Sequence, residues 1–127
     1  MTRPAVGICV AVHPARFGPW DQDVAMVPAT LVTAVHELRW LPLLLIVDEA
    51  LATEPEEALR LLDGMIVPEW LAEADRYVDF SRRLGEAAEA RGLPVLRLPA
   101  SLLKPATAVA EYSGAMRGLF TSVAPSA

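Results

Sequence analysis

The sequence predicts an α/β fold in which a small parallel sheet is flanked by helices. Short apolar runs alternate with helical patterns along the chain, and short polar segments connect them. The first runs are continuous rather than alternating with polar residues, which is typical of strands covered on both faces of a parallel sheet. This order favours right-handed crossovers and a doubly wound sheet of about four strands.

The first expected strand is followed by an expected long loop. Residues 5–12 form an apolar run rich in β-branched side chains, which predicts a buried strand. Residues 13–25 are polar and are interrupted by Pro14, Gly18 and Pro19, so they predict a loop.

A helix and a second strand are expected next. Pro28 suits the first turn of a helix, and Leu31, Val35 and Leu38 give that helix one apolar stripe. The apolar run 41–47 predicts a second buried strand.

The remaining elements follow the same alternation. The last expected helix carries Val109, Tyr112, Met116 and Leu119 on one face, since they are three or four positions apart. The expected elements are a helix with a capping box at 53–56 and a stop at Gly64, a strand at 65–67, a helix at 72–91 ended by Gly92, a strand at 93–98 and a helix at 104–120.

The length and composition of the chain limit the functions that it can have. The 127 residues fit one domain, expected over 1–120, with a flexible tail at 121–127. The chain has 11 Lys+Arg against 16 Asp+Glu and a net charge of −5, which argues against nucleic acid or an anionic membrane as a partner. The longest apolar run, 40–47, is far shorter than the roughly 20 residues that span a bilayer.

The single cysteine and the two histidines give no metal or redox motif. Cys9 lies within the first strand and is expected to be an inert core residue, with no disulfide framework and no zinc cluster. His13 and His36 lack metal-ligand spacing, and no glycine-rich phosphate-binding motif is present. We therefore expect a cytoplasmic protein without a metal or a cofactor.

Polar and aromatic side chains follow the expected strands and would meet at one edge of a parallel sheet. Their mixture suits a small organic ligand with an apolar body and a polar group. The candidate catalytic residues are Glu69, Asp21 and His13, and the candidate substrate-binding residues are Arg16, Phe17, Trp20 and Trp70.

Glu69 is the most informative of these residues, because the short strand before it delivers it directly to the sheet edge. A carboxylate in an aromatic, partly dry pocket can have a raised pKa and act as an acid or a base. The alternative is that Glu69 is a solvated loop carboxylate.

Three stretches are fairly specific in their combined order and spacing. They are Arg3-Pro-Ala-Val-Gly-Ile8 with Pro14-Ala-Arg-Phe-Gly-Pro-Trp-Asp21 and Val27-Pro-Ala-Thr-Leu-Val-Thr-Ala-Val35; Leu41-Pro-Leu-Leu-Leu45 leading to Leu61-Leu-Asp-Gly-Met-Ile-Val67; and Ala88-Glu-Ala-Arg-Gly-Leu-Pro-Val-Leu96. Together they resemble the N-terminal half of class I glutamine amidotransferase-like proteins, in particular the γ-glutamyl-γ-aminobutyrate hydrolase (peptidase C26) branch. The resemblance implies a truncated, flavodoxin-like domain.

The resemblance also implies that the catalytic parts of that family are missing. Pro99 stands where the family has its nucleophilic cysteine, and neither glycine of the nucleophile elbow is present. Glu69 replaces a glycine of the oxyanion loop and would repel an oxyanion. The family's catalytic His and Glu lie in a C-terminal half that these 127 residues do not include. We therefore expect no glutaminase or γ-glutamyl hydrolase activity.

Two functions remain open. The first is a repurposed domain that binds a small organic molecule, either as a binding protein or as an accessory acid/base enzyme of secondary metabolism that catalyses cyclisation, isomerisation or hydrolysis. The alternative is a non-catalytic subunit, homodimeric or completed by another protein, because a truncated sheet exposes an edge that must be covered. The apolar face of the last helix would then pack either on a partner or on its own sheet. The sequence leaves open whether the chain is an enzyme.

Overall fold

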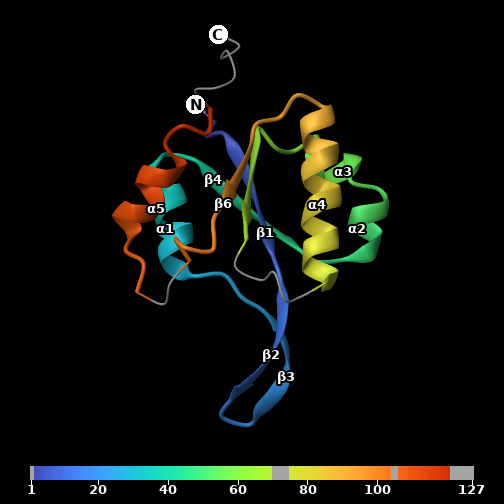
Figure 1. Cartoon of the computed structure of the whole chain (residues 1–127), viewed down its shortest axis with the longest axis vertical. Helices are drawn as coiled ribbons and strands as arrows, with labels where there is room; N and C mark the ends of the chain where they lie inside the picture. Colours follow the sequence, from blue (N-terminus) through green and yellow to red (C-terminus); the bar gives the residue numbers. More distant parts are fainter. Residues whose placement is uncertain (1, 70–74, 104–105, 121–127) are drawn as a thin grey trace.

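A four-stranded parallel sheet lies at the centre of the molecule, with the strand order β4-β1-β5-β6 (Figure 1). The computed structural model describes residues 2–69, 75–103 and 106–120. The four strands are β1 (Ala5–Val10), β4 (Leu41–Ile46), β5 (Gly64–Pro68) and β6 (Val95–Leu98). The predicted α/β class, with a small flavodoxin-like parallel sheet, is confirmed.

Helices cover both faces of this sheet (Figure 1). One face packs against α1 (Ala29–Glu37) and α5 (Val109–Met116). The other face packs against α2 (Glu49–Thr53), α3 (Glu56–Leu59) and α4 (Asp75–Ala90). Within the described ranges, no helix is both long enough and apolar enough to cross a membrane.

The core has two halves because side chains alternate between the faces of a strand. Val6 and Ile8 of β1 pack with Ile66 of β5 under α1 and α5. Cys9 and Met65 point to the opposite face and pack under α2, α3 and α4. The central strands β1 and β5 are therefore buried on both faces, as their continuous apolar runs predict.

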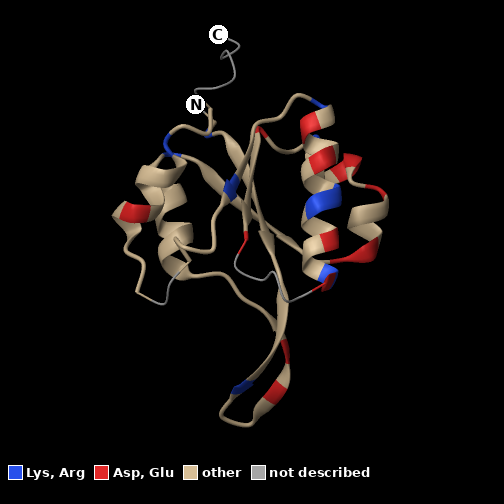
Figure 2. Ribbon diagram, in the orientation of Figure 1, with Lys and Arg blue, Asp and Glu red and all other residues tan. Residues whose placement is uncertain are grey.

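Charged residues are distributed unevenly between the two helical layers (Figure 2). The exposed side of α4 carries linked ion pairs, in which Arg82 contacts Asp79 at 2.8 Å and Glu86 at 3.3 Å. The same layer has an ion pair between Arg83 and Glu49 at 3.2 Å. Few charged positions mark α1 and α5 in the same view.

The loop predicted at 13–25 is wrong. These residues belong to an antiparallel hairpin formed by β2 (Val12–Phe17) and β3 (Trp20–Ala25), which continues from the end of β1 and extends away from the sheet (Figure 1). The tight turn is possible because Gly18 adopts a φ of 52°, which L side chains rarely take. Pro14 is tolerated because both strands of a two-stranded ribbon are edge strands.

The prediction that 41–47 is buried on both faces is also wrong. β4 is an edge strand that pairs with β1 alone among the strands that the structure describes. Leu44 and Ile46 are 46% and 44% exposed. The side chain of Leu45 points to the other face and is buried.

The expected capping box at 53–56 does not form. Thr53 belongs to α2, where its hydroxyl donates to Glu49 Oε1 at 3.3 Å. α3 begins at Glu56 after Pro55, without a side-chain cap. The two short helices replace the single helix that the sequence predicts here, because Pro55 supplies no backbone N–H.

The last helix is shorter than expected and packs on the molecule's own sheet. α5 ends at Met116, and Tyr112, Met116 and Leu119 are buried against the sheet. The predicted apolar stripe is therefore part of the core of this chain. The predicted tail at 121–127 lies outside the described residues.

Candidate functional site

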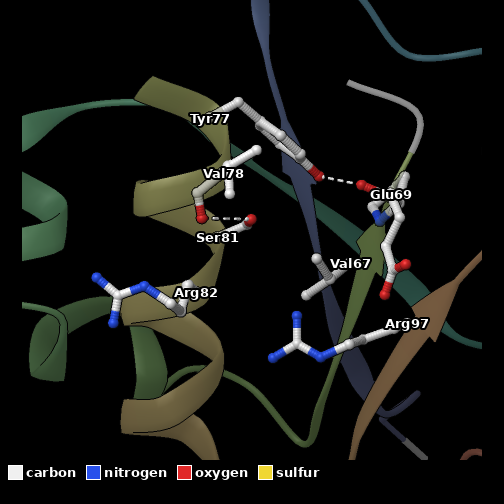
Figure 3. A pocket seen from close by; sticks show the side chains of 8 residues that line it. Val67, Glu69, Tyr77, Val78, Ser81, Arg82 and Arg97 are labelled. Atoms are coloured by element: carbon white, nitrogen blue, oxygen red, sulfur yellow. Dashed lines mark hydrogen bonds between the residues drawn. The ribbon is translucent and has the colours of Figure 1, made fainter. Parts of the chain in front are cut away.

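A pocket of about 330 Å³ opens between α4 and the carboxyl ends of β5 and β6 (Figure 3). Val67 of β5 and Val78 of α4 give it apolar walls. Its polar groups come from Glu69, which directly follows β5, from Arg97 of β6, and from Tyr77, Ser81 and Arg82 of α4. Ligands of open α/β sheets bind at this end of the strands.

Small side chains on α4 make room for this pocket. Ser81 and Gly85 are four residues apart and therefore lie on one face of the helix, toward β6. A Cβ atom at Gly85 would lie only 2.9 Å from Nη2 of Arg97. The Arg97 guanidinium thus occupies the space where any other residue at position 85 would place a side chain.

Arg97 is the least paired cation of the pocket. Its side chain is 41% exposed, and its one ion pair among the described residues is with Glu89 at 3.9 Å. In contrast, Arg82 contacts Asp79 at 2.8 Å, and this hydrogen bond is the main reason why its pKa is raised. Arg97 therefore has donors available for a ligand.

The hydroxyl group of Tyr77 lies beside the ends of the two central strands, β1 and β5. This hydroxyl donates to the backbone oxygen of Pro68 at 2.6 Å (Figure 3). The same hydroxyl lies 3.5 Å from the backbone oxygen of Cys9. Burial, with the nearby Cys9 and Glu69, raises the pKa of Tyr77, so the group stays a neutral donor. β1 and β5 are also the strands from which the sheet grows in opposite directions, where ligands of doubly wound sheets bind.

A second pocket of about 350 Å³ lies on the other side of Tyr77. It is lined by Val47 after β4, by Asp23 of β3 and by Asp75 and Arg76 of α4. Tyr77 is the one lining residue that the two pockets share, so its ring separates them.

Glu69 directly follows β5 at the sheet edge and lines the first pocket. Its exposure agrees with the alternative of a solvated carboxylate. The backbone N–H of Glu69 donates to Leu98 O at 2.8 Å, which ties it to the end of β6. Trp70, its predicted partner, lies outside the described residues.

The other predicted site residues lie on the hairpin. Arg16 and Asp21 form an ion pair at 3.2 Å, and Phe17 and Trp20 beside the turn are 57% and 61% exposed. His13 is half-buried in β2 opposite Val24. None of these five lines either pocket, so the structure does not bring Asp21 or His13 together with Glu69. The expected convergence assumes a loop, whereas the hairpin carries these residues away from the sheet edge.

Three residues of the pocket, Arg97, Tyr77 and Ser81, are not among the predicted site residues. Arg97 has a sequence signal, because it is the one charged residue in the apolar strand Val95–Leu98. Tyr77 and Ser81 have a weaker one, because they share a helix face with Gly85, where the small residues Ser81 and Gly85 leave space for a neighbour.

The predicted inertness of Cys9 agrees with its surroundings. Cys9 is fully buried, and this burial raises the pKa of its thiol to about 12. Pro99, which follows β6, offers no nucleophile. Across 2–69, 75–103 and 106–120, no group of three or more His, Cys, Asp or Glu is arranged to hold a metal ion.

Neither the known protein-family models nor the curated proteins include a match to this chain. The resemblance to class I amidotransferases therefore stays a prediction from the motifs.

Proposed function

We propose that this chain is a degenerate amidotransferase-like domain that binds a small organic molecule and has no glutaminase or γ-glutamyl hydrolase activity. The observation that carries the proposal is the pocket between α4, β5 and β6, with its apolar walls and its weakly paired Arg97. Its volume of about 330 Å³ lies within the range of small-molecule sites, roughly 300–1,000 Å³. A cytoplasmic location is part of this proposal.

Any acid/base chemistry in this pocket would depend on Glu69. Of the three candidate catalytic residues, Glu69 is the one that lines the pocket, whereas Asp21 is held by Arg16 on the hairpin. An accessory role in secondary metabolism, such as an isomerisation, would use its carboxylate to move a proton. Loss of turnover with retained binding in Glu69→Gln would support this step.

The binding function is tested by screening small organic fragments of mixed charge against the full chain by NMR. We expect chemical-shift changes at Val67, Val78 and Ser81. Gly85→Leu should abolish them, because its side chain would clash with the Arg97 guanidinium and displace it from its place beside the pocket. Gly114→Ala in α5 is the matched control, since a Cβ there meets no neighbour. If no fragment binds, or if Gly85→Leu binds as well as the wild type, the proposal is wrong.

A second candidate function, as a homodimeric subunit, is favoured by the outer edge of β4. The backbone N–H groups of Leu41 and Val47 donate toward the β1 side, to Pro4 O and Val10 O. Because this direction alternates along a strand, the N–H groups of Leu44 and Ile46 face outward, beside exposed side chains. Two such edges could pair antiparallel, each residue 44 opposite residue 46 of the other copy.

Sedimentation equilibrium tests this candidate. The wild type should be dimeric, and Leu44→Lys should be monomeric, because a buried charge would oppose strand pairing. Leu61→Lys, at a 63% exposed residue outside β4, is the control and should remain dimeric. A monomeric wild type would exclude the homodimer.

A further inference from the structure

We propose that the pocket between α4, β5 and β6 binds a small organic monocarboxylate with an apolar body. Arg97 would bind the carboxylate, and Glu69 would exclude ligands with a second negative charge. This inference rests on the proposed binding function and specifies the ligand. It follows from which charges in the pocket are already paired.

The other donors of the pocket are already engaged. The Tyr77 hydroxyl donates to Pro68 O at 2.6 Å, and the Ser81 hydroxyl donates to Val78 O at 3.3 Å. Arg82 contacts Asp79 and Glu86, and Figure 3 shows its guanidinium turned away from the strands. An anion in this pocket would therefore be held by Arg97.

Arg97 is oriented toward the space beside α4. It lies opposite Val67 in the β5–β6 register, and Figure 3 shows its guanidinium below Val67 and facing α4. Gly85 leaves room for the guanidinium at this depth. A planar guanidinium with free N–H groups can bind both oxygens of a carboxylate.

The walls next to Arg97 favour an apolar ligand body. Val67 and Val78 both line the pocket, and Val78, which is 42% exposed, offers most of the aliphatic surface to a ligand that lies between strand and helix. Burial of such surface stabilises a complex in proportion to the apolar area removed from water. A bare inorganic anion would gain nothing from these walls.

Glu69 limits the charge of the ligand. It lines the same pocket as Arg97, and no described cation forms an ion pair with it. A ligand with one carboxylate on Arg97 would bring a second carboxylate close to that of Glu69, where like charges repel. The pocket should therefore prefer monocarboxylates to dicarboxylates of the same shape.

The test uses benzoate, phenylacetate and hexanoate, each with its neutral amide, and phthalate as the dianion. Dissociation constants are measured on the full chain by NMR titration. At least one monocarboxylate should bind about tenfold more tightly than its amide, because charge-assisted hydrogen bonds are the stronger ones. Phthalate should bind more weakly than benzoate.

Variants assign the two roles. Arg97→Met should weaken carboxylate binding about tenfold or more and amide binding much less, whereas Arg97→Lys should keep part of the preference. Arg83→Gln is the control, because Arg83 pairs with Glu49 outside this pocket and its loss should change nothing. Glu69→Gln should improve phthalate binding by a larger factor than benzoate binding, so the difference between the two ligands should shrink.

The outcomes distinguish a wrong ligand assignment from a wrong binding function. If amides bind as well as carboxylates, or if Arg97→Met keeps the preference in a protein with a wild-type melting curve, the ligand assignment is wrong and the binding function stands. If neither the acids nor the amides bind while the fragment screen finds other ligands, the assignment is again wrong. If nothing binds in either experiment, the binding function itself fails.

Discussion

Tyr77 connects α4 to the ends of both central strands through one hydroxyl group. The residue is 3% exposed, and its hydroxyl donates to Pro68 O while lying 3.5 Å from Cys9 O. A buried carbonyl that loses its donor keeps its full desolvation cost. Tyr77 therefore stabilises the packing of α4 on β1 and β5, and it lies at the position that the two pockets share.

Removing this hydroxyl should destabilise the protein. We expect Tyr77→Phe to lower the free energy of unfolding by about 1–3 kcal/mol, because the buried Pro68 carbonyl would lose its hydrogen bond. Urea denaturation monitored by circular dichroism measures the change. Tyr112→Phe is the matched control, since the Tyr112 hydroxyl makes no hydrogen bond within the described ranges. An equal loss in both variants would contradict the explanation.

Cys9 should make the fold sensitive to alkali. Burial raises the pKa of its thiol from 9.0 to about 12, so the folded state holds the proton more tightly than the unfolded state does. This contribution is fully present below pH 9 and is lost as the pH rises toward about 12. Tyr77 acts in the same direction, because burial raises its pKa too.

Urea titrations across that pH window measure the effect. The free energy of unfolding should fall with rising pH, and it should fall less steeply in Cys9→Ala, where only Tyr77 remains. A thiol reagent should label Cys9 in the wild type only after unfolding. Rapid labelling of the folded protein at neutral pH would show that the thiol is not buried as described.

The hairpin of β2 and β3 does not pack into either half of the core. No residue of β2 or β3 belongs to either buried cluster, and Ala11, which directly precedes β2, is the cluster member at the base of the hairpin. Its turn depends on Gly18, whose φ is 52°. The hairpin should therefore open without unfolding the sheet.

Gly18→Ala should weaken the hairpin alone. A residue with a Cβ at this φ costs about 1 kcal/mol, so the amides of β2 and β3 should exchange faster with solvent. Hydrogen exchange followed by NMR measures this, and the urea midpoint of the whole protein should stay constant. A shifted midpoint would mean that the hairpin is part of the cooperative core.

The elements that were predicted correctly are those that bury apolar residues with a clear pattern. β1 and β5 are predicted because strands buried on both faces read as continuous apolar runs. The hairpin was missed because a two-stranded ribbon has no buried face, so β3, with Asp21, Gln22 and Asp23, shows no apolar alternation. β4 looks equally apolar but lies at an edge, which depends on the strand order and not on its own composition.

The candidate site was predictable only where one segment determines it. Glu69 was found because the residue after a parallel strand reaches the sheet edge. Arg97 was missed because its accessibility depends on Gly85 of α4 and on the pairing partners of its neighbours, which lie in other segments. The hairpin residues were expected at this edge because residues 13–25 were predicted to form a loop there. The hairpin instead extends away from the sheet (Figure 1).

At the scale of the whole molecule, the proposed loss of amidotransferase activity can be tested directly. The purified chain should release no ammonia from glutamine or from γ-glutamyl amides in a coupled assay. Pro99→Cys should remain inactive as well, because a thiol alone lacks the base and the oxyanion donors that the family uses. Ammonia release by the wild type would overturn the proposed loss of function.

The position of β1 in the middle of the sheet has a consequence for synthesis of the chain. β1 is made first, yet its partners β4 and β5 begin only at Leu41 and Gly64. While the chain grows on a ribosome, the apolar segment Ala5–Val10 must therefore wait unpaired until β4 has been made, and its second edge stays open until β5 follows. During that interval its apolar side chains and open edges can bind chaperones or aggregate with other nascent chains.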